Sequence, residues 1–83
     1  MNNELTPYIK YHLNGNVWIK GQKNSVGERE GLWEWFYENG NIRWRTSYKE
    51  GKIDGIVECF DEQGNIIRTT LWKNGEVIET TEH

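Results

Sequence analysis

Short runs of aromatic and β-branched residues alternate along the chain with turn signals that contain glycine. An Asn-Gly pair between two such runs is the strongest local signal for a two-residue type I′ hairpin. Turns are predicted at six glycines: Gly15, Gly27, Gly40, Gly51, Gly64 and Gly75. The pattern therefore predicts an all-β fold, a meander of stacked β-hairpins with about seven antiparallel strands in one twisted, curved sheet.

The turn glycines recur at intervals of 24 or 25 residues, which is about the length of one hairpin. Aromatic residues recur with them, since Tyr11, Phe36 and Phe60 take the same place in successive units. Self-similarity at a fixed period is typical of repeat architectures, in which each unit packs on its neighbours. We interpret residues 1–83 as a single domain of three repeats, at about residues 8–31, 32–55 and 56–79.

Counting outward from the turn at Asn39 and Gly40 predicts which side chains lie opposite one another. Trp35 falls opposite Trp44 on one face of the sheet. The same count gives four further pairs: Glu34 with Arg45, Trp33 with Thr46, Phe36 with Arg43 and Tyr37 with Ile42.

The turn at Glu50 and Gly51 provides a second count, independent of the first. It places Tyr48 opposite Ile53, Trp44 opposite Val57, Ile42 opposite Cys59 and Arg43 opposite Glu58. Both counts thus yield an opposite-charge pair on the same face, which supports the register.

Two glycines lie inside predicted strands rather than at turns, at Gly31 and Gly55. By the same counting, Gly31 lies opposite Tyr48 and Gly55 opposite Trp72. A glycine within a strand often marks a bend or a place where a large neighbouring ring crosses the backbone. We expect the two aromatic rings to cover the two glycines.

The runs GLWEWFYENG at 31–40 and YKEGKIDG at 48–55 resemble MORN-type repeats, in the bacterial variant described as antitoxin-like. The pattern G-x-W-x-x-[FY]-[FY]-x-N-G, followed by aromatic-x-x-G-K-x-[DE]-G, fits the second repeat closely. The third repeat has Val57 and Asp61 where the pattern has aromatic residues, and the first has one additional residue before Gly31. The resemblance spans about residues 8–79 and implies an elongated sheet used as a scaffold or interaction surface.

The 83 residues suffice for one small domain, and only 35% of them are hydrophobic. Five Trp, four Tyr and two Phe must therefore supply much of the apolar area. The formal charge of -3 and the absence of a basic cluster lead us to expect neither nucleic acid nor membrane lipid as a partner. A single cysteine and a start without the features of a signal peptide predict the cytoplasm.

We expect no enzymatic activity and no cofactor. His12 and His83 are the only histidines, so neither a Ser-His-Asp nor a Cys-His arrangement is indicated. One cysteine and one internal histidine give no metal-ligand cluster at a recognisable spacing. Hairpin turns account for the glycines without a phosphate-binding loop.

The predicted register gathers large rings on one face of the sheet. The candidate partner-binding residues are Trp33, Trp35, Tyr37, Trp44, Tyr48 and Trp72. Such a stripe is more often packed core than functional surface, but a single-layer sheet has nothing behind it, and large apolar patches are seldom left bare. Either the sheet curls on itself, or copies pair face to face, or a partner lies on it.

We therefore expect a non-enzymatic protein-binding module, antitoxin- or inhibitor-like as the resemblance implies, that acts on another protein through its aromatic sheet surface. The alternative is a structural scaffold that self-associates as a homodimer through its apolar face or its exposed edge strands.

Overall fold

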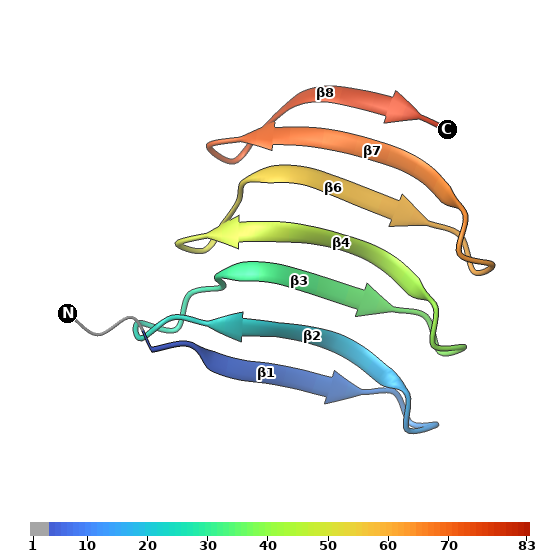
Figure 1. Ribbon diagram of the computed structural model, residues 1–83, viewed down its shortest axis with the longest axis horizontal. Helices are drawn as coiled ribbons and strands as arrows, with labels where there is room; N and C mark the ends of the chain where they lie inside the picture. Colours follow the sequence, from blue (N-terminus) through green and yellow to red (C-terminus); the bar gives the residue numbers. More distant parts are fainter. Residues whose placement is uncertain (1–3) are drawn as a thin grey trace.

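The computed structural model describes residues 4–83 and shows one antiparallel β-sheet (Figure 1). The strands are β1 (Thr6–Tyr11), β2 (Val17–Lys23), β3 (Gly31–Phe36), β4 (Ile42–Lys49), β5 (Lys52–Ile53), β6 (Gly55–Phe60), β7 (Ile66–Lys73) and β8 (Glu76–Glu82). Their order in the sheet is β1-β2-β3-β4-β6-β7-β8, and β5 pairs with β4. The all-β meander is therefore confirmed, with β5 as an additional two-residue strand. In the described part of the chain, no helix is long and apolar enough to cross a membrane.

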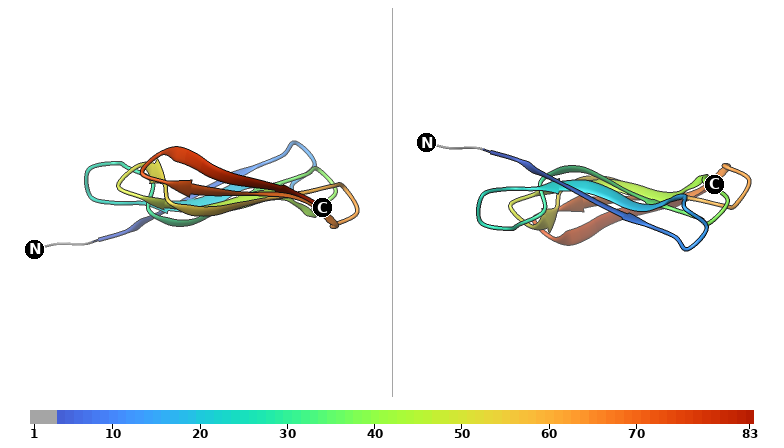
Figure 2. Two further views of the ribbon diagram at one scale, coloured as in Figure 1. Left: turned by 90° about the horizontal axis from the view of Figure 1, so that it is seen from above. Right: turned by 90° about the horizontal axis from the view of Figure 1, so that it is seen from below.

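The sheet is a single twisted layer, as the edge-on views in Figure 2 show. Its extents are 42 × 36 × 12 Å. We call the side that carries Trp33, Trp44 and Val57 the tryptophan face, and the side that carries Glu34 and Arg45 the reverse face. The side chains classed as buried within residues 4–83 are Ile19, Trp33, Thr46 and Val57. All four lie on the tryptophan face, so the core of this layer is one-sided.

The hairpin loop between β3 and β4 has three residues, 38–40, rather than two. The N–H of Tyr37 donates to the carbonyl of Asn41 at 2.8 Å, and that of Gly40 donates to the carbonyl of Tyr37 at 3.0 Å. Gly40 has φ 94°, whereas Asn39 keeps a negative φ. A type I′ turn needs positive φ at both positions, so that prediction is wrong here, and the loop is a type I turn followed by a left-handed glycine.

The same hydrogen-bond pattern closes the loops at Gly15, Gly27 and Gly64. Two turns on the side of the sheet opposite to Gly40 have type I′ geometry instead. Glu50 and Gly51 have φ of 50° and 85°, and Asn74 and Gly75 have 53° and 81°. From Gly40 onwards the two kinds of turn alternate along the meander, and Figure 1 shows the loops on the two sides of the sheet.

A β-bulge follows the three-residue loop, because Phe36 pairs with Ile42 but Trp35 pairs with Trp44. Arg43 is the additional residue. The predicted pairs of Phe36 with Arg43 and of Tyr37 with Ile42 are therefore wrong. Beyond the bulge the predicted register is confirmed in four pairs: Trp35 with Trp44, Glu34 with Arg45, Trp33 with Thr46 and Gly31 with Tyr48. The predicted register is correct beyond the bulge because two irregularities cancel. The loop is one residue longer than predicted, and the additional residue Arg43 in β4 shifts the pairing back by one.

The register between β4 and β6 differs from the prediction by two residues. Tyr48 pairs with Ile53 as expected, but the ladder then breaks at Asp54, and β6 begins at Gly55 with φ 114°. Consequently Trp44 lies opposite Cys59, and Arg45 opposite Glu58. The predicted pairs Trp44 with Val57, Ile42 with Cys59 and Arg43 with Glu58 are wrong. Since side chains alternate with a period of two, a shift of two leaves every residue on its predicted face.

Successive repeats are joined at the three-residue loops by side chains that bond to carbonyls one repeat further on. Nε2 of His12 lies 2.8 Å from the carbonyl oxygen of Phe36, and the Tyr37 hydroxyl donates to that of Phe60 at 2.7 Å. Four asparagine amides do the same, from Asn14 and Asn16 to Glu38 and from Asn39 and Asn41 to Glu62. These bonds hold the hairpins in a fixed stack and keep the sheet faces rigid.

Candidate protein-binding face

Trp33 is the centre of the tryptophan face and is 0% exposed. Its indole lies over Gly21 of β2, where a Cβ would fall 2.1 Å from Cδ2 of the ring. The indole Nε1–H donates to the carbonyl of Gln22 at 2.9 Å. Around it stand the rings of Tyr8 at 5.4 Å, Trp35 at 5.8 Å and Tyr48 at 6.1 Å between centroids. A glycine below and three rings around it thus let a single-layer sheet bury a tryptophan.

Trp35 and Trp44 extend this cluster towards the middle of the sheet. Their rings are stacked, with centroids 3.7 Å apart and planes 7° from parallel. Both side chains are half-buried. Trp35 is packed between Trp33 on one side and Trp44 on the other. The stacked rings of Trp35 and Trp44 therefore offer a rigid apolar surface, and part of its area is open to solvent.

Arg29, from the connection between β2 and β3, lies over this cluster. Its guanidinium carbon is 4.7 Å from the centroid of Trp33, 5.4 Å from that of Trp35 and 5.3 Å from that of Tyr48. Nη1 donates to the Tyr48 hydroxyl at 3.1 Å. The carbonyl of Arg29 accepts the N–H of Gly51, which anchors its backbone. Arg29 was not among the predicted site residues, since nothing in a loop sequence shows over which rings the loop folds.

Two lysines reach the same face at its N-terminal edge. Nζ of Lys23 lies 4.6 Å and Nζ of Lys10 lies 5.8 Å from the ring centroid of Tyr8. Both distances are within the range of cation–π attraction. Aromatic rings and cations are therefore interleaved on this part of the tryptophan face.

The structure brings together four of the six candidate residues: Trp33, Trp35, Trp44 and Tyr48. Tyr37 lies apart, at the loop edge, with its hydroxyl bonded to Phe60. Trp72 lies on β7, and its Nε1–H donates to the hydroxyl of Thr70 at 2.9 Å. Trp33 itself has no exposed area, so it supports its neighbours rather than offering a surface.

The in-strand glycines have another explanation than the expected aromatic cover. Gly31 lies opposite Tyr48 and Gly55 opposite Trp72, as predicted. However, a Cβ on Gly31 would meet the side-chain amide of Gln22 at 2.8 Å, and one on Gly55 would meet nothing within 4 Å. Their φ values of 72° and 114° account for the glycines, because L-residues rarely adopt them.

Comparison with known proteins agrees with this repeat geometry. A family model described as MORN repeat variant matches residues 29–50 and 53–74. The chain belongs to the MORN repeat variant family. The β1–β2 hairpin lies outside these matches, yet it has the same three-residue loop and the same bulge position as the two MORN hairpins. A search of curated proteins and of solved structures found no match.

MORN repeats are generally modules for interaction with proteins or membranes, and the family is typically non-catalytic. In this MORN chain, no group of three or more His, Cys, Asp or Glu side chains is placed to hold a metal ion among residues 4–83. Cys59 is half-buried between Trp44 and Arg68 in the sheet.

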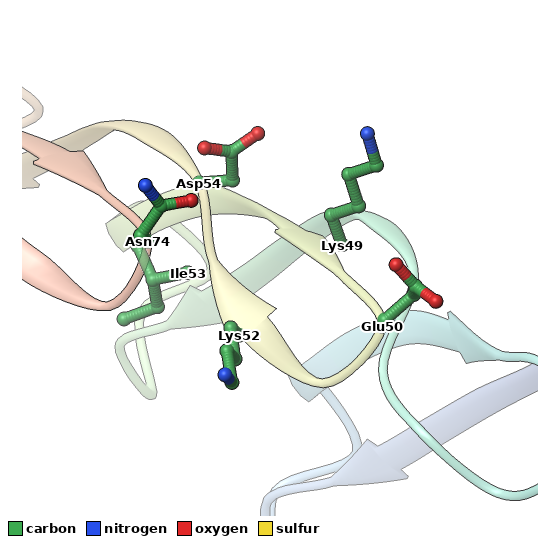
Figure 3. Close-up of a pocket in the computed structure, with 6 residues that line it drawn as sticks. All are labelled: Lys49, Glu50, Lys52, Ile53, Asp54 and Asn74. Atoms are coloured by element: carbon green, nitrogen blue, oxygen red, sulfur yellow. The ribbon is translucent and has the colours of Figure 1, made fainter.

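A hollow of about 430 Å³ lies at the edge formed by the type I′ turns (Figure 3). It is lined by Lys49, Glu50, Lys52, Ile53, Asp54 and Asn74. Figure 3 shows these side chains pointing in different directions, five of them from residues 49–54 and one, Asn74, from the turn between β7 and β8. They do not converge on a common point, so this hollow does not have the arrangement of a catalytic site.

The reverse face of the MORN sheet has a different character. Nε of Arg45 donates to Glu58 at 2.7 Å, and the guanidinium lies 5.5 Å from the ring centroid of Phe60. Leu32 and Ile56 are 53% and 55% exposed on this side. Two shallow hollows of about 190 and 390 Å³ meet at Ile56 and Glu58. This face therefore combines an ion pair with scattered exposed aliphatic side chains.

Proposed function

We propose that this chain is a non-enzymatic, antitoxin- or inhibitor-like protein-binding module whose tryptophan face docks on another protein. The stacked pair of Trp35 and Trp44 carries the proposal. Tryptophan is enriched at the energetic centres of protein interfaces, where a few rings supply most of the binding free energy.

Rigidity supports this proposal as much as composition does. Trp35 is held between Trp33 and Trp44, and Trp33 is fixed by its bond to the carbonyl of Gln22. A surface that is ordered before binding loses little conformational entropy on association. The sheet measures 42 × 36 Å across, which leaves room for a contact of the usual size, about 800 Å² per partner.

The experiment is affinity capture from a lysate with three forms of the protein. The wild type, Trp44→Ala and Leu32→Ala should all fold, because the packing of Trp33 against Tyr8, Trp35 and Tyr48 remains intact. We expect Trp44→Ala to lose the captured protein and Leu32→Ala, on the reverse face, to keep it. Equal capture by all three forms would exclude the tryptophan face as the docking surface.

A second candidate function is self-association as a scaffold through the reverse face. The observation that favours it is the exposed apolar side chains Leu32, Ile56 and Leu71, since aliphatic groups that cluster on a surface favour contact with another surface. Light scattering at tens of micromolar should then give twice the monomer mass, and Ile56→Glu should return the protein to a monomer. A monomer mass for the wild type would dismiss this candidate.

A further inference from the structure

Charge is unevenly divided between the two sides of the sheet, although the whole chain has a formal charge of -3. Three cations lie over the rings of Tyr8, Trp33, Trp35 and Tyr48: Lys10, Lys23 and Arg29. A fourth, Arg43, lies 5.8 Å from the ring centroid of Tyr37 at the loop edge. The ion pairs found within residues 4–83 join Arg45 with Glu58 and Arg68 with Glu82, so none of the three is neutralised by a carboxylate in direct contact.

The two acidic residues that flank Arg29 in the sequence accept hydrogen bonds from other groups. Glu30, next to Arg29, accepts the backbone N–H of Glu50 at 2.7 Å. Glu28 accepts a bond from the side chain of Asn24 at 3.1 Å, within its own loop. Carboxylates of the central strands, such as Glu34 and Glu58, lie on the reverse face. The charged side chains that lie directly over the aromatic cluster and over Tyr8 are therefore cationic.

The guanidinium of Arg29 retains donors for a ligand. One of its nitrogens donates to Tyr48, while an arginine carries five N–H groups in a fixed plane. A carboxylate that approaches the edge of this plane gains a charge-assisted hydrogen bond without displacing the guanidinium from the rings. Lys10 is exposed and Lys23 half-buried, so both ammonium groups are also accessible at the rim.

We propose that the tryptophan face recognises an acidic segment of another protein. Carboxylates of that segment pair with Lys10, Lys23 and Arg29, and its apolar side chains lie on Trp35 and Trp44. This inference rests on the proposed function and specifies the chemistry of the partner. Complementary charge at the rim of an aromatic centre speeds encounter and selects among partners, while the apolar contact supplies most of the affinity.

Other anions are less suited to this surface. Nucleic acids and anionic membranes present dense arrays of negative charge and bind to extended basic patches. Here three cations lie over Tyr8 and the Trp33 cluster, at one end of the sheet, and the whole chain has a formal charge of -3. A stacked tryptophan pair beside a few cations matches a mixed acidic and apolar peptide better.

The test uses two short synthetic peptides, one alternating glutamate with leucine and the other alternating glutamine with leucine. Fluorescence anisotropy should show that the wild type binds the glutamate peptide about tenfold more tightly, with the difference disappearing as salt is raised. Lys10→Glu with Lys23→Glu should abolish that preference. The matched control, Lys20→Glu with Lys49→Glu, changes the net charge equally on other parts of the surface and should retain it.

Each other outcome overturns the inference. Equal binding of the two peptides, or equal loss in both double variants, shows that the local charge plays no part. Binding of an oligonucleotide or of phosphatidylserine vesicles that depends on Lys10 and Lys23, without peptide binding, assigns the surface to a different anion. If a protein captured from lysate depends on Trp44 but not on these lysines, the proposed function stands and only the acidic partner is wrong.

Discussion

Trp35 and Trp44 stack face to face across neighbouring strands, with their ring centroids 3.7 Å apart and their planes within 7° of parallel. Trp35 contacts the buried Trp33, and both Trp35 and Trp44 keep part of their area exposed to solvent. The pair therefore contributes to stability and offers surface to a partner at once, and substitutions can separate the two roles.

Trp35→Ala should destabilise the fold more than Trp18→Ala. Trp35 contacts rings on both sides, whereas Trp18 is 42% exposed and lies 6.0 Å from the ring of His12. We expect Trp35→Ala to lower the free energy of unfolding by about 2 to 3 kcal/mol, because a stacked pair adds to the loss of buried area. Urea denaturation followed by circular dichroism measures both variants. Equal losses would show that the stack adds nothing to stability.

Gly21→Ala should be poorly tolerated, because the added methyl would fall 2.1 Å from the Trp33 ring. Overpacking of this kind costs about 1 to 3 kcal/mol. In a Trp33→Leu background the same change should cost much less, since the ring that fills the space is gone. Thermal unfolding of the wild type, the two single variants and the double variant gives the four values required. A cost that does not depend on residue 33 would show that the indole does not lie over Gly21.

A double-mutant cycle can separate the two registers that are possible between β4 and β6. Arg45 and Glu58 are paired at 2.7 Å with side chains 43% and 31% exposed, so solvent screening limits their coupling to about 0.5 kcal/mol. We expect Arg45→Ala and Glu58→Ala to be coupled by that amount in chemical denaturation. Arg43→Ala and Glu58→Ala should be additive. Coupling of the second pair instead would restore the register counted from the sequence.

Asp61 should titrate at lower pH than an ordinary aspartate. The backbone N–H of Asn65 donates to its carboxylate at 2.9 Å and that of Gln63 at 3.0 Å, and these bonds hold the pKa of Asp61 below 3.8. Since the folded pKa is the lower one, the stabilisation is fully present above pH 3.8 and is lost as pH falls through the folded value. Carbon-13 NMR of the side-chain carboxyl measures the midpoint. A midpoint at or above 3.8 would contradict these bonds.

The sequence predicts the faces of this sheet better than it predicts the strand register. Side-chain alternation has a period of two, so the break at Asp54, which displaces β6 by two residues, leaves Trp44 and Val57 on the same face as predicted. The Trp35–Trp44 pair was predicted through two errors that cancel, a loop one residue longer and a bulge at Arg43. Counting residues from a turn cannot detect either irregularity.

The candidate site was predicted in part for a similar reason. Rings that share a face gather as expected around Trp33. Tyr37 lies apart from them at the loop edge, and Trp72 lies on β7, opposite Gly55 and two strands away from β4. The place of Gly21 under the Trp33 ring could have been predicted, because this glycine interrupts a strand that lies next to the strand of Trp33. The place of Arg29 could not, since its position over the rings depends on the path of the connection between β2 and β3.

We expect the tryptophan face, and not the reverse face, to contact the partner. Lys10 and Lys20 provide a matched pair for testing this expectation, because both are exposed and lie on adjacent strands but point to opposite faces. Each is replaced in turn by the photo-cross-linking residue p-benzoylphenylalanine, and the complex with the captured protein is irradiated. We expect a covalent adduct from position 10 and none from position 20. An adduct from position 20 alone would contradict this expectation.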